Sequence, residues 1–222
     1  MAKKQKNQSA EAVVEALSKT EKFFTDYKKH ILYSLLAIVI LVGGGFAYYK
    51  FVHEPANKEA QEQMIQAENY FSEGNYDAAL NGDGNALGFA EIAETYGNKA
   101  GRSVYLYAGI CELANNNYEQ AISYLKSYKG KDAILKARAL SCIGDAYTGL
   151  EDYTQAIKYF EKAAKVEDNI YAAAYLLRAG IASEKLDHND AALKYYKQIK
   201  DKYPHSMEAY TIDKYISRIE AK

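Results

Sequence analysis

The sequence predicts an all-α protein: a long apolar N-terminal helix, then a solenoid of about four helix-turn-helix units and a capping C-terminal helix. Three observations predict this fold. Nineteen uncharged residues run from Ile31 to Tyr49. Beyond them a short pattern recurs at intervals of 42, 35 and 36 residues, and a period in this range indicates a helical repeat. The chain of 222 residues has two prolines, which favours long uninterrupted helices.

The apolar run has the length of a membrane span. At ~1.5 Å per residue, nineteen helical residues rise about 28 Å, close to the ~30 Å hydrocarbon core of a bilayer. A cleaved signal peptide has a shorter charged head, a shorter apolar stretch and a small-x-small cleavage site, none of which this sequence shows. We therefore expect a cytoplasmic tail over residues 1–29, a transmembrane signal-anchor helix over 30–52, and a solenoid domain over 56–222.

The distribution of lysines predicts the orientation of the span. Four lysines lie close to its N-terminal side and two close to its other side: Lys19, Lys22, Lys28 and Lys29 against Lys50 and Lys58. Loops rich in lysine stay in the cytoplasm. We therefore expect a cytoplasmic N-terminus and a solenoid on the outer face of the membrane.

Two shorter patterns lie in this N-terminal region. Ser18-x-x-Glu21 is a capping box, which predicts a helix start in the tail. Gly43-x-x-x-Ala47, with Gly44 beside it, is a small-xxx-small pattern that permits close approach of a second spanning helix. We name Gly43, Gly44 and Ala47 as candidate helix-contact residues; the alternative is that the pattern arose by chance.

The repeated segments are "FSEGNYDAAL", "ANNNYEQAISYL", "GLEDYTQAIKYF" and "LDHNDAALKYY". Each has an alanine three residues after its equivalent Tyr or Asn, at Ala79, Ala121, Ala156 and Ala192. With Gly109, Gly144 and Gly180 where paired helices would cross, these units resemble the tetratricopeptide repeat, a helix-turn-helix of 34 residues. Asn117 and Asp152 are expected to cap second helices, and residues from about 206 to 219 to form the closing helix.

The first spacing is longer than the others because of an insertion at "NGDGN", residues 81–85. A calcium loop would need glycine at the position of Ala86 and glutamate at that of Ile92. We therefore predict a turn, with helix resuming in "ALGFAEIAETYG".

The chain shows no catalytic motif. Its four histidines have no metal-ligand spacing, and no Gly-x-Ser-x-Gly or phosphate-binding glycine loop is present. We expect no enzyme activity, cofactor, metal or small-molecule substrate. Residues 51–222 hold 20 basic and 25 acidic residues, so we expect no nucleic-acid partner. Cys111 and Cys142 fall on first helices of adjacent units; buried free thiols are expected, with a disulfide as the open alternative.

The first helices of the units should form a concave partner-binding groove. Its predicted residues mix apolar and polar side chains: Met64, Glu68, Leu106, Ile110, Leu113, Arg138, Ser141, Asp145, Leu177, Ile181 and Glu184. Such a groove suits an extended polypeptide better than a single charged C-terminal tail, which would need a lysine and arginine clamp. The alternative is that the apolar members belong to the core.

The whole organisation resembles a family of membrane-anchored tetratricopeptide proteins that are ancillary subunits of the bacterial SecYEG translocon. The resemblance is carried by "EKFFTDYKKHILYSLLAIVILVGGGFAYYKF", "AGICELANNNYEQAISYL" and "GDAYTGLEDYTQAIKYFEKAA". It implies a bacterial inner-membrane protein with a periplasmic solenoid, in contact with lipid and Sec channel subunits. It also implies a chaperone-like role toward exported precursors or periplasmic chaperones. A different hypothesis is a static scaffold that binds one partner in a cell-wall or outer-membrane assembly complex.

Overall fold

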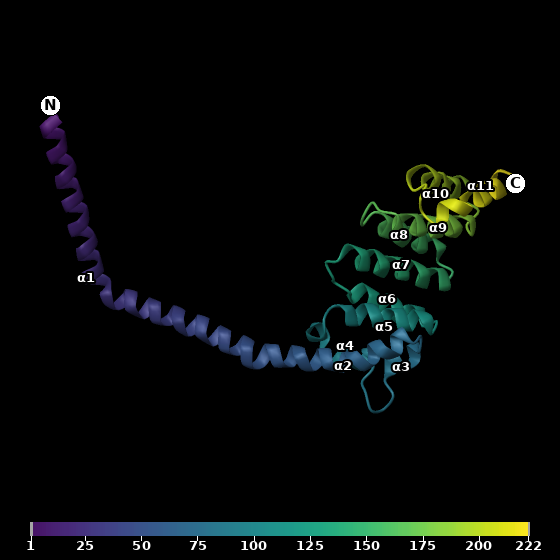
Figure 1. The fold of residues 1–222 in the computed structure, drawn as a ribbon, viewed down its shortest axis with the longest axis horizontal. Helices are drawn as coiled ribbons and strands as arrows, with labels where there is room; N and C mark the ends of the chain where they lie inside the picture. The colour runs from purple at the N-terminus through teal and green to yellow at the C-terminus, as the bar shows by residue number, and fades with distance from the viewer. Residues whose placement is uncertain (1, 222) are drawn as a thin grey trace. The chain divides into compact units, whose positions relative to one another are not determined.

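The computed structural model describes the backbone of residues 2–221, and the side chains of Ser18, Glu21, Lys22 and residues 25–221. Every regular element of this backbone is helical (Figure 1), which confirms the predicted all-α class. The chain divides into two compact units, Met1–Pro55 and Ala56–Lys222.

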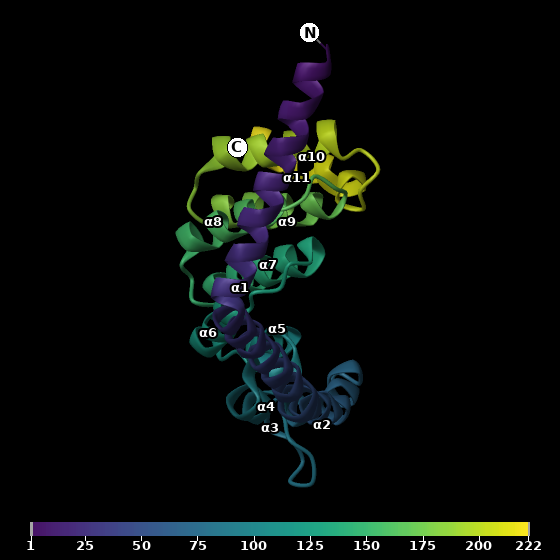
Figure 2. The same cartoon turned by 90° about the vertical axis from the view of Figure 1, so that its left-hand side faces the viewer.

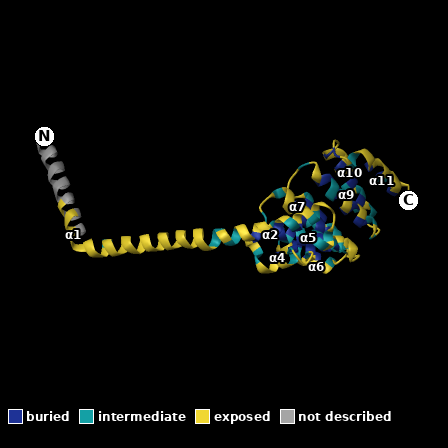
Figure 3. Ribbon diagram, turned by 60° about the horizontal axis from the view of Figure 1, so that its bottom comes forward, coloured by how far each residue is buried: buried dark blue, intermediate teal, exposed yellow. Residues whose placement is uncertain are grey.

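The first unit consists of α1 (Ala2–Tyr48) and a five-residue π-helix, η1 (Tyr49–His53). An 18-residue window here has a mean hydropathy of 2.2, and none of it is buried. The large apolar residues from Leu32 to Val52 are exposed (Figure 3). By length and composition, this helix could cross a membrane.

The expected helix start at Ser18 is wrong. α1 begins at Ala2 and runs through Ser18 without a break, so Ser18 lies in a helix interior. A capping box stabilises a helix end only where the preceding chain leaves the helix. Residues 2–17 are rich in lysine, glutamine, alanine and glutamate, which are strong helix formers, and the helix continues through them.

The second unit is a series of helix pairs. The pairs are α2 (Glu54–Ser72) with α3 (Tyr76–Asn81), α5 (Ser103–Ala114) with α6 (Tyr118–Ser127), α7 (Ala133–Gly149) with α8 (Tyr153–Ala164), and α9 (Tyr171–Glu184) with α10 (Asn189–Lys202). From α5 onward, successive pairs stack on one another (Figures 1 and 2). This arrangement is the predicted solenoid.

All four pairs use the same turn. The first helix of each pair ends before a residue of positive φ, and these residues are Gly74 (77°), Asn116 (61°), Glu151 (59°) and Asp187 (57°). The next N–H donates to the carbonyl five residues back at 2.9–3.0 Å, a hydrogen bond that satisfies a carbonyl of the helix end. The repeat is therefore a repeat of backbone geometry as well as of side chains.

Glycine at the helix crossing allows the two helices of a pair to approach closely. A Cβ at Gly144 would lie 2.6 Å from the Phe160 ring, and one at Gly180 would lie 2.3 Å from the Tyr196 ring. Both rings are buried. The packing role that the sequence assigned to these glycines is confirmed.

One of the two predicted caps forms. The Asp152 carboxylate accepts the Gln155 N–H at 3.0 Å, as expected. Asn117 makes no capping bond; its amide instead donates to the Glu112 carboxylate at 2.8 Å. Glu112 is buried, and a buried carboxylate needs a donor, so this bond replaces the cap.

The insertion in the first repeat, residues 81–85, is a turn, as predicted. Asp83 Oδ1 accepts the N–H groups of Asn85 and Ala86 at 2.9 and 2.8 Å, and the Tyr70 hydroxyl donates to Asp83 Oδ2 at 2.8 Å. These donors, that of Ala86 first, lower the pKa of Asp83. The helix then resumes as α4 (Phe89–Thr95) and a 3-10 turn, η2 (Gly97–Ala100).

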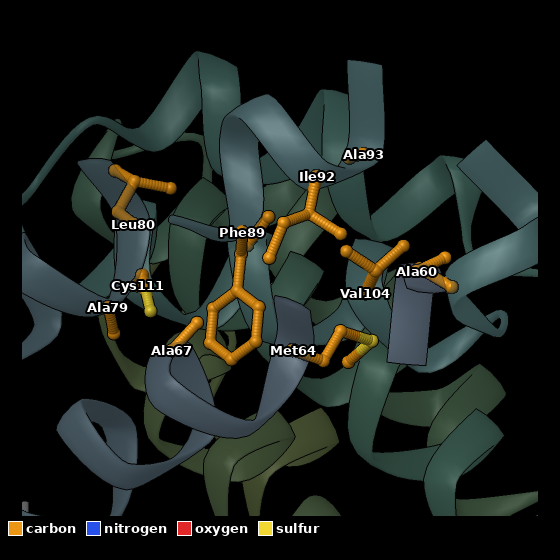
Figure 4. Close-up of a cluster of buried hydrophobic side chains, with 12 residues drawn as sticks. Ala60, Met64, Ala67, Ala79, Leu80, Phe89, Ile92, Ala93, Val104 and Cys111 are labelled. Carbon is orange, nitrogen blue, oxygen red and sulfur yellow. The ribbon is translucent and has the colours of Figure 1, made fainter. Parts of the chain in front are cut away.

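The helix that follows this turn, α4, contributes to the core of the first pair. Phe89 is fully buried in a cluster with Met64, Ala67 and Val104. Figure 4 draws the Phe89 ring in the middle of this cluster, with Met64 and Ala67 beside it. Phe89 of α4 thus packs against the face of α2 that carries Met64 and Ala67.

A closing helix covers the last pair, as predicted. A 3-10 turn, η3 (Glu208–Thr211), leads into α11 (Ile212–Glu220). Ile212, Ile216 and Ile219 are buried against the last repeat. Arg218 pairs with Glu184, which also accepts the Tyr196 hydroxyl at 2.6 Å.

Candidate functional site

A cavity of about 280 Å³ lies between α5, α7 and α9, the first helices of three successive pairs. Its lining residues come from all three helices: Ile110, Leu113, Arg138, Ser141, Cys142, Asp145, Tyr171, Ala174, Tyr175 and Arg178. The repeat places these residues together because equivalent positions of stacked units lie on the same face.

Three of the lining residues are joined by hydrogen bonds of Arg178. Arg178 Nη1 donates to Ser141 Oγ at 2.6 Å and to Asp145 Oδ2 at 3.1 Å. Burial raises the pKa of Asp145, while Arg178 and then Arg138 act in the opposite direction. These hydrogen bonds join α9 to α7, and they satisfy the hydroxyl of buried Ser141.

Two further polar groups line the same cavity. Arg138 is exposed, and Tyr175 is half-buried. Within residues 25–221, neither the Arg138 guanidinium nor the Tyr175 hydroxyl has a hydrogen-bond or ion-pair partner. Burial raises the pKa of Tyr175, and both arginines act to lower it, so the phenol is neutral near pH 7 and remains a donor.

Apolar and aromatic side chains also line this cavity. Ile110 and Leu113 come from α5. Tyr171, at the start of α9 and 55% exposed, also borders a small neighbouring cavity that contains Ile134, 51% exposed. The polar lining residues therefore come from α7 and α9, and apolar or aromatic ones come from α5 and from the start of α9.

Family models of the tetratricopeptide repeat match residues 137–170 and 174–206. These ranges correspond to the α7–α8 and α9–α10 pairs. These two helix pairs are tetratricopeptide repeats. No curated protein matches it. Neither matched family is catalytic, and tetratricopeptide repeats bind other proteins across their helical faces.

The tetratricopeptide array brings together five of the eleven predicted groove residues. Ile110, Leu113, Arg138, Ser141 and Asp145 all line the cavity. They come from two adjacent repeats, at positions one to two helical turns apart.

The other six predicted residues lie outside this cavity. Met64 and Leu106 are 4% and 2% exposed and belong to the core, so their side chains do not reach the surface. Glu184 is held by Arg218 and Tyr196. The remaining three are exposed or half-buried on first helices but do not line it: Glu68, Leu177 and Ile181.

Leu177, Ile181 and Glu184 of α9 were predicted from the sequence as groove residues. Tyr175 and Arg178 of the same helix, which line the cavity, were missed. A signal for Arg178 exists, because each crossing glycine is preceded two residues earlier by an equivalent position. Tyr107 and Cys142 fill that position in the second and third repeats, and Arg178 fills it in the fourth. A charged residue at a position that is uncharged in the other repeats indicates a function other than the packing of the repeat.

A larger cavity of about 510 Å³ lies along α8 and α10. Its acidic groups are already engaged: Tyr195 donates to Glu161 at 2.6 Å, and Tyr203 donates to Asp168 at 2.7 Å. Lys202 also pairs with Asp168 at 2.7 Å. Since these polar groups are already hydrogen-bonded or ion-paired with one another, we place the candidate site in the groove of the first helices.

Cys111 and Cys142 are both buried and free, as the sequence analysis expected. Burial raises the pKa of Cys111 to about 12 and that of Cys142 to about 11. Among the described residues, no group of three or more histidine, cysteine, aspartate or glutamate side chains is arranged to hold a metal ion.

The candidate helix-contact residues lie on open surface of the first unit. Gly43, Gly44 and Ala47 are exposed. A Cβ built on either glycine would meet no described atom within 4 Å. The surface around them is accessible to a second helix.

Proposed function

We propose that this protein is a membrane-anchored adaptor that binds an extended segment of another protein in the groove between α5, α7 and α9. The observation that carries the proposal is the cavity itself, which combines polar and apolar side chains from three successive repeats. A surface that crosses several repeats suits an extended chain, because such a chain presents alternate side chains to successive pockets.

The anchor in this proposal is the apolar part of α1, over residues 30–52. It follows a cytoplasmic N-terminal tail, residues 1–29, and holds the solenoid, residues 56–222, on the outer, periplasmic face of a bacterial inner membrane. The lysine bias around the span supports this orientation. Gly43, Gly44 and Ala47 would contact another spanning helix.

The partners in this proposal are Sec translocon subunits beside the anchor, and exported precursors or periplasmic chaperones in the groove. Its support is the resemblance of the whole organisation to ancillary translocon subunits. Contact with a client would be brief, since an unfolded segment loses conformational entropy when it binds.

Photo-crosslinking in native membranes tests the proposal. A crosslinking amino acid replaces Tyr171 in the groove or Gly44 in the span, and exposed Lys158 on α8 serves as the control position. We expect several exported precursors or chaperones at Tyr171, and Sec channel subunits at Gly44, with neither at Lys158.

Other outcomes decide against parts of the proposal. A single envelope protein captured at Tyr171 would replace the adaptor by a static scaffold. Capture of lipid alone at Gly44 would contradict the proposed contact with the translocon. Protein adducts at Tyr171 no more abundant than at Lys158 would contradict the groove as a binding site.

A further inference from the structure

The groove between α5, α7 and α9 holds more hydrogen-bond donors than acceptors. Two arginines and a tyrosine hydroxyl face a single carboxylate, that of Asp145. Arg178 already uses this carboxylate and the Ser141 hydroxyl. In the part of the chain whose side chains are described, Arg138 and Tyr175 are left without an acceptor. These two groups are therefore available to donate to an acceptor on a ligand.

The negative charge of the surrounding domain makes the donors of the groove selective for an anionic group. Residues 51–222 carry 25 acidic and 20 basic residues, whereas the cavity carries two arginines against one aspartate. A local positive site on an acidic domain attracts an anionic group to one place while the rest of the surface repels it. A planar guanidinium also matches a carboxylate in a bidentate pair.

We propose that the groove takes the carboxylate of an internal aspartate or glutamate in an extended protein segment. Arg138 forms the ion pair, and the Tyr175 hydroxyl donates a second hydrogen bond. This inference rests on the proposed function, because it names the chemistry of the segment that the groove binds. Arg178 stays bound to Asp145 and keeps α7 and α9 at the spacing that the ligand needs.

The apolar parts of the lining, on α5 and at the start of α9, indicate that the acidic residue is internal to its segment. Ile110 and Leu113 come from α5 and Tyr171 from α9, the first helices of the repeats before and after the one that carries Arg138. In an extended chain, the residues two before and two after a given residue point to the same side as it does. Apolar side chains at those two positions would cover both α5 and the start of α9, whereas a chain terminus would leave one of these two parts uncovered.

Peptide binding to the full-length chain in mild detergent tests this inference. The probe is a fluorescent, C-terminally amidated peptide of about nine residues, with a central glutamate flanked two positions away by leucine and phenylalanine. A second peptide has glutamine at the centre, and a third combines central glutamine with a free C-terminus. Fluorescence anisotropy gives the Kd of each peptide for the unaltered chain and for Arg138→Gln, Tyr175→Phe and Lys136→Gln.

We expect the glutamate peptide to bind roughly tenfold more tightly than either glutamine peptide, as one charge-assisted pair provides. Arg138→Gln should abolish this difference, and Tyr175→Phe should reduce it. Lys136→Gln removes one positive charge from the exposed surface of the same helix and should leave the difference intact, which separates the ion pair from net charge.

The remaining outcomes separate this inference from the proposed function. Equal binding of the three peptides would overturn the carboxylate site and leave the peptide groove standing. Tight binding of only the peptide with a free C-terminus would show that the groove takes a terminal carboxylate instead. Lack of binding by every peptide would contradict the groove itself.

Discussion

Single residues in the turns carry a conformational cost that only the first repeat avoids. Gly74 adopts its positive φ without a Cβ, whereas Asn116, Glu151 and Asp187 hold the same left-handed conformation with side chains. That conformation costs an ordinary L-residue roughly 1–2 kcal/mol, and asparagine and aspartate tolerate it best. Glu151 is therefore the least suitable of the four.

Glu151→Gly should stabilise the folded protein by about 1 kcal/mol, because glycine reaches positive φ at no steric cost. Asn116→Gly is the matched control in the neighbouring repeat. It should gain less, since asparagine tolerates the conformation and its side chain accepts the Tyr118 hydroxyl at 2.9 Å. Urea denaturation measures both, and an equal or larger gain at Asn116 would contradict the argument.

Gly180→Ala should destabilise the protein by about 1–3 kcal/mol, the usual cost of overpacking a core. Its new methyl group would lie 2.3 Å from a carbon of the Tyr196 ring. Tyr196 is fully buried and bonded to Glu184, so the ring has no free space into which to move. An unchanged urea midpoint would show that the helices of this pair can separate without cost.

Cys111 and Cys142 should be unreactive toward iodoacetamide in the folded protein at pH 8 and should react after unfolding in urea. The thiolate is the nucleophile, and burial raises the two pKa values to about 12 and 11. Because the unfolded thiols lose their protons first, the folded state should also lose stability as the pH rises from about 9 through those values. Equal rates of alkylation in the folded and unfolded protein, followed by mass spectrometry, would contradict this.

At the scale of elements, the period of the sequence was enough to predict the helix pairs and the closing helix. The stretch 81–85 was predicted as an insertion followed by a helix, and the structure adds that Phe89 of this helix, α4, fills the core beside α2. Met64 was assigned to the groove because its position in the repeat is ligand-facing. Met64 is buried beside Phe89 instead, and no local pattern shows where Phe89 packs.

The closing helix α11 is held by three isoleucines on one face. Ile216→Ala should destabilise the protein by about 2–4 kcal/mol, the range for truncating a buried isoleucine. Ser217→Ala is the control on the exposed face of the same helix and should change the unfolding free energy by no more than about 0.5 kcal/mol. Equal effects of the two substitutions in urea denaturation would show that α11 does not cover the last repeat in solution.

For the whole molecule, the proposed anchor should resist extraction from membranes by alkaline carbonate. Leu36→Arg combined with Val39→Arg places two charges in the apolar run, each costing about 2.5–3.5 kcal/mol at the centre of a bilayer. We expect this variant in the soluble fraction. Ile65→Arg, at an exposed apolar position of α2, is the control and should remain with the membrane. Release of the unaltered chain would contradict the anchor.

The sequence by itself determined the all-α class, the tetratricopeptide pairs, the apolar helix and the turn at "NGDGN". These properties depend on residues close together in the chain, so hydropathy and periodicity reveal them. Only the tertiary structure decided which side chains share the groove. Arg178 meets Ser141 and Asp145 across 37 and 33 residues, and Glu184 is withdrawn by Arg218 from 34 residues away. Two factors determine such partners: how neighbouring repeats stack, and the need of each buried polar group for a hydrogen bond. The sequence of a single repeat predicts neither factor.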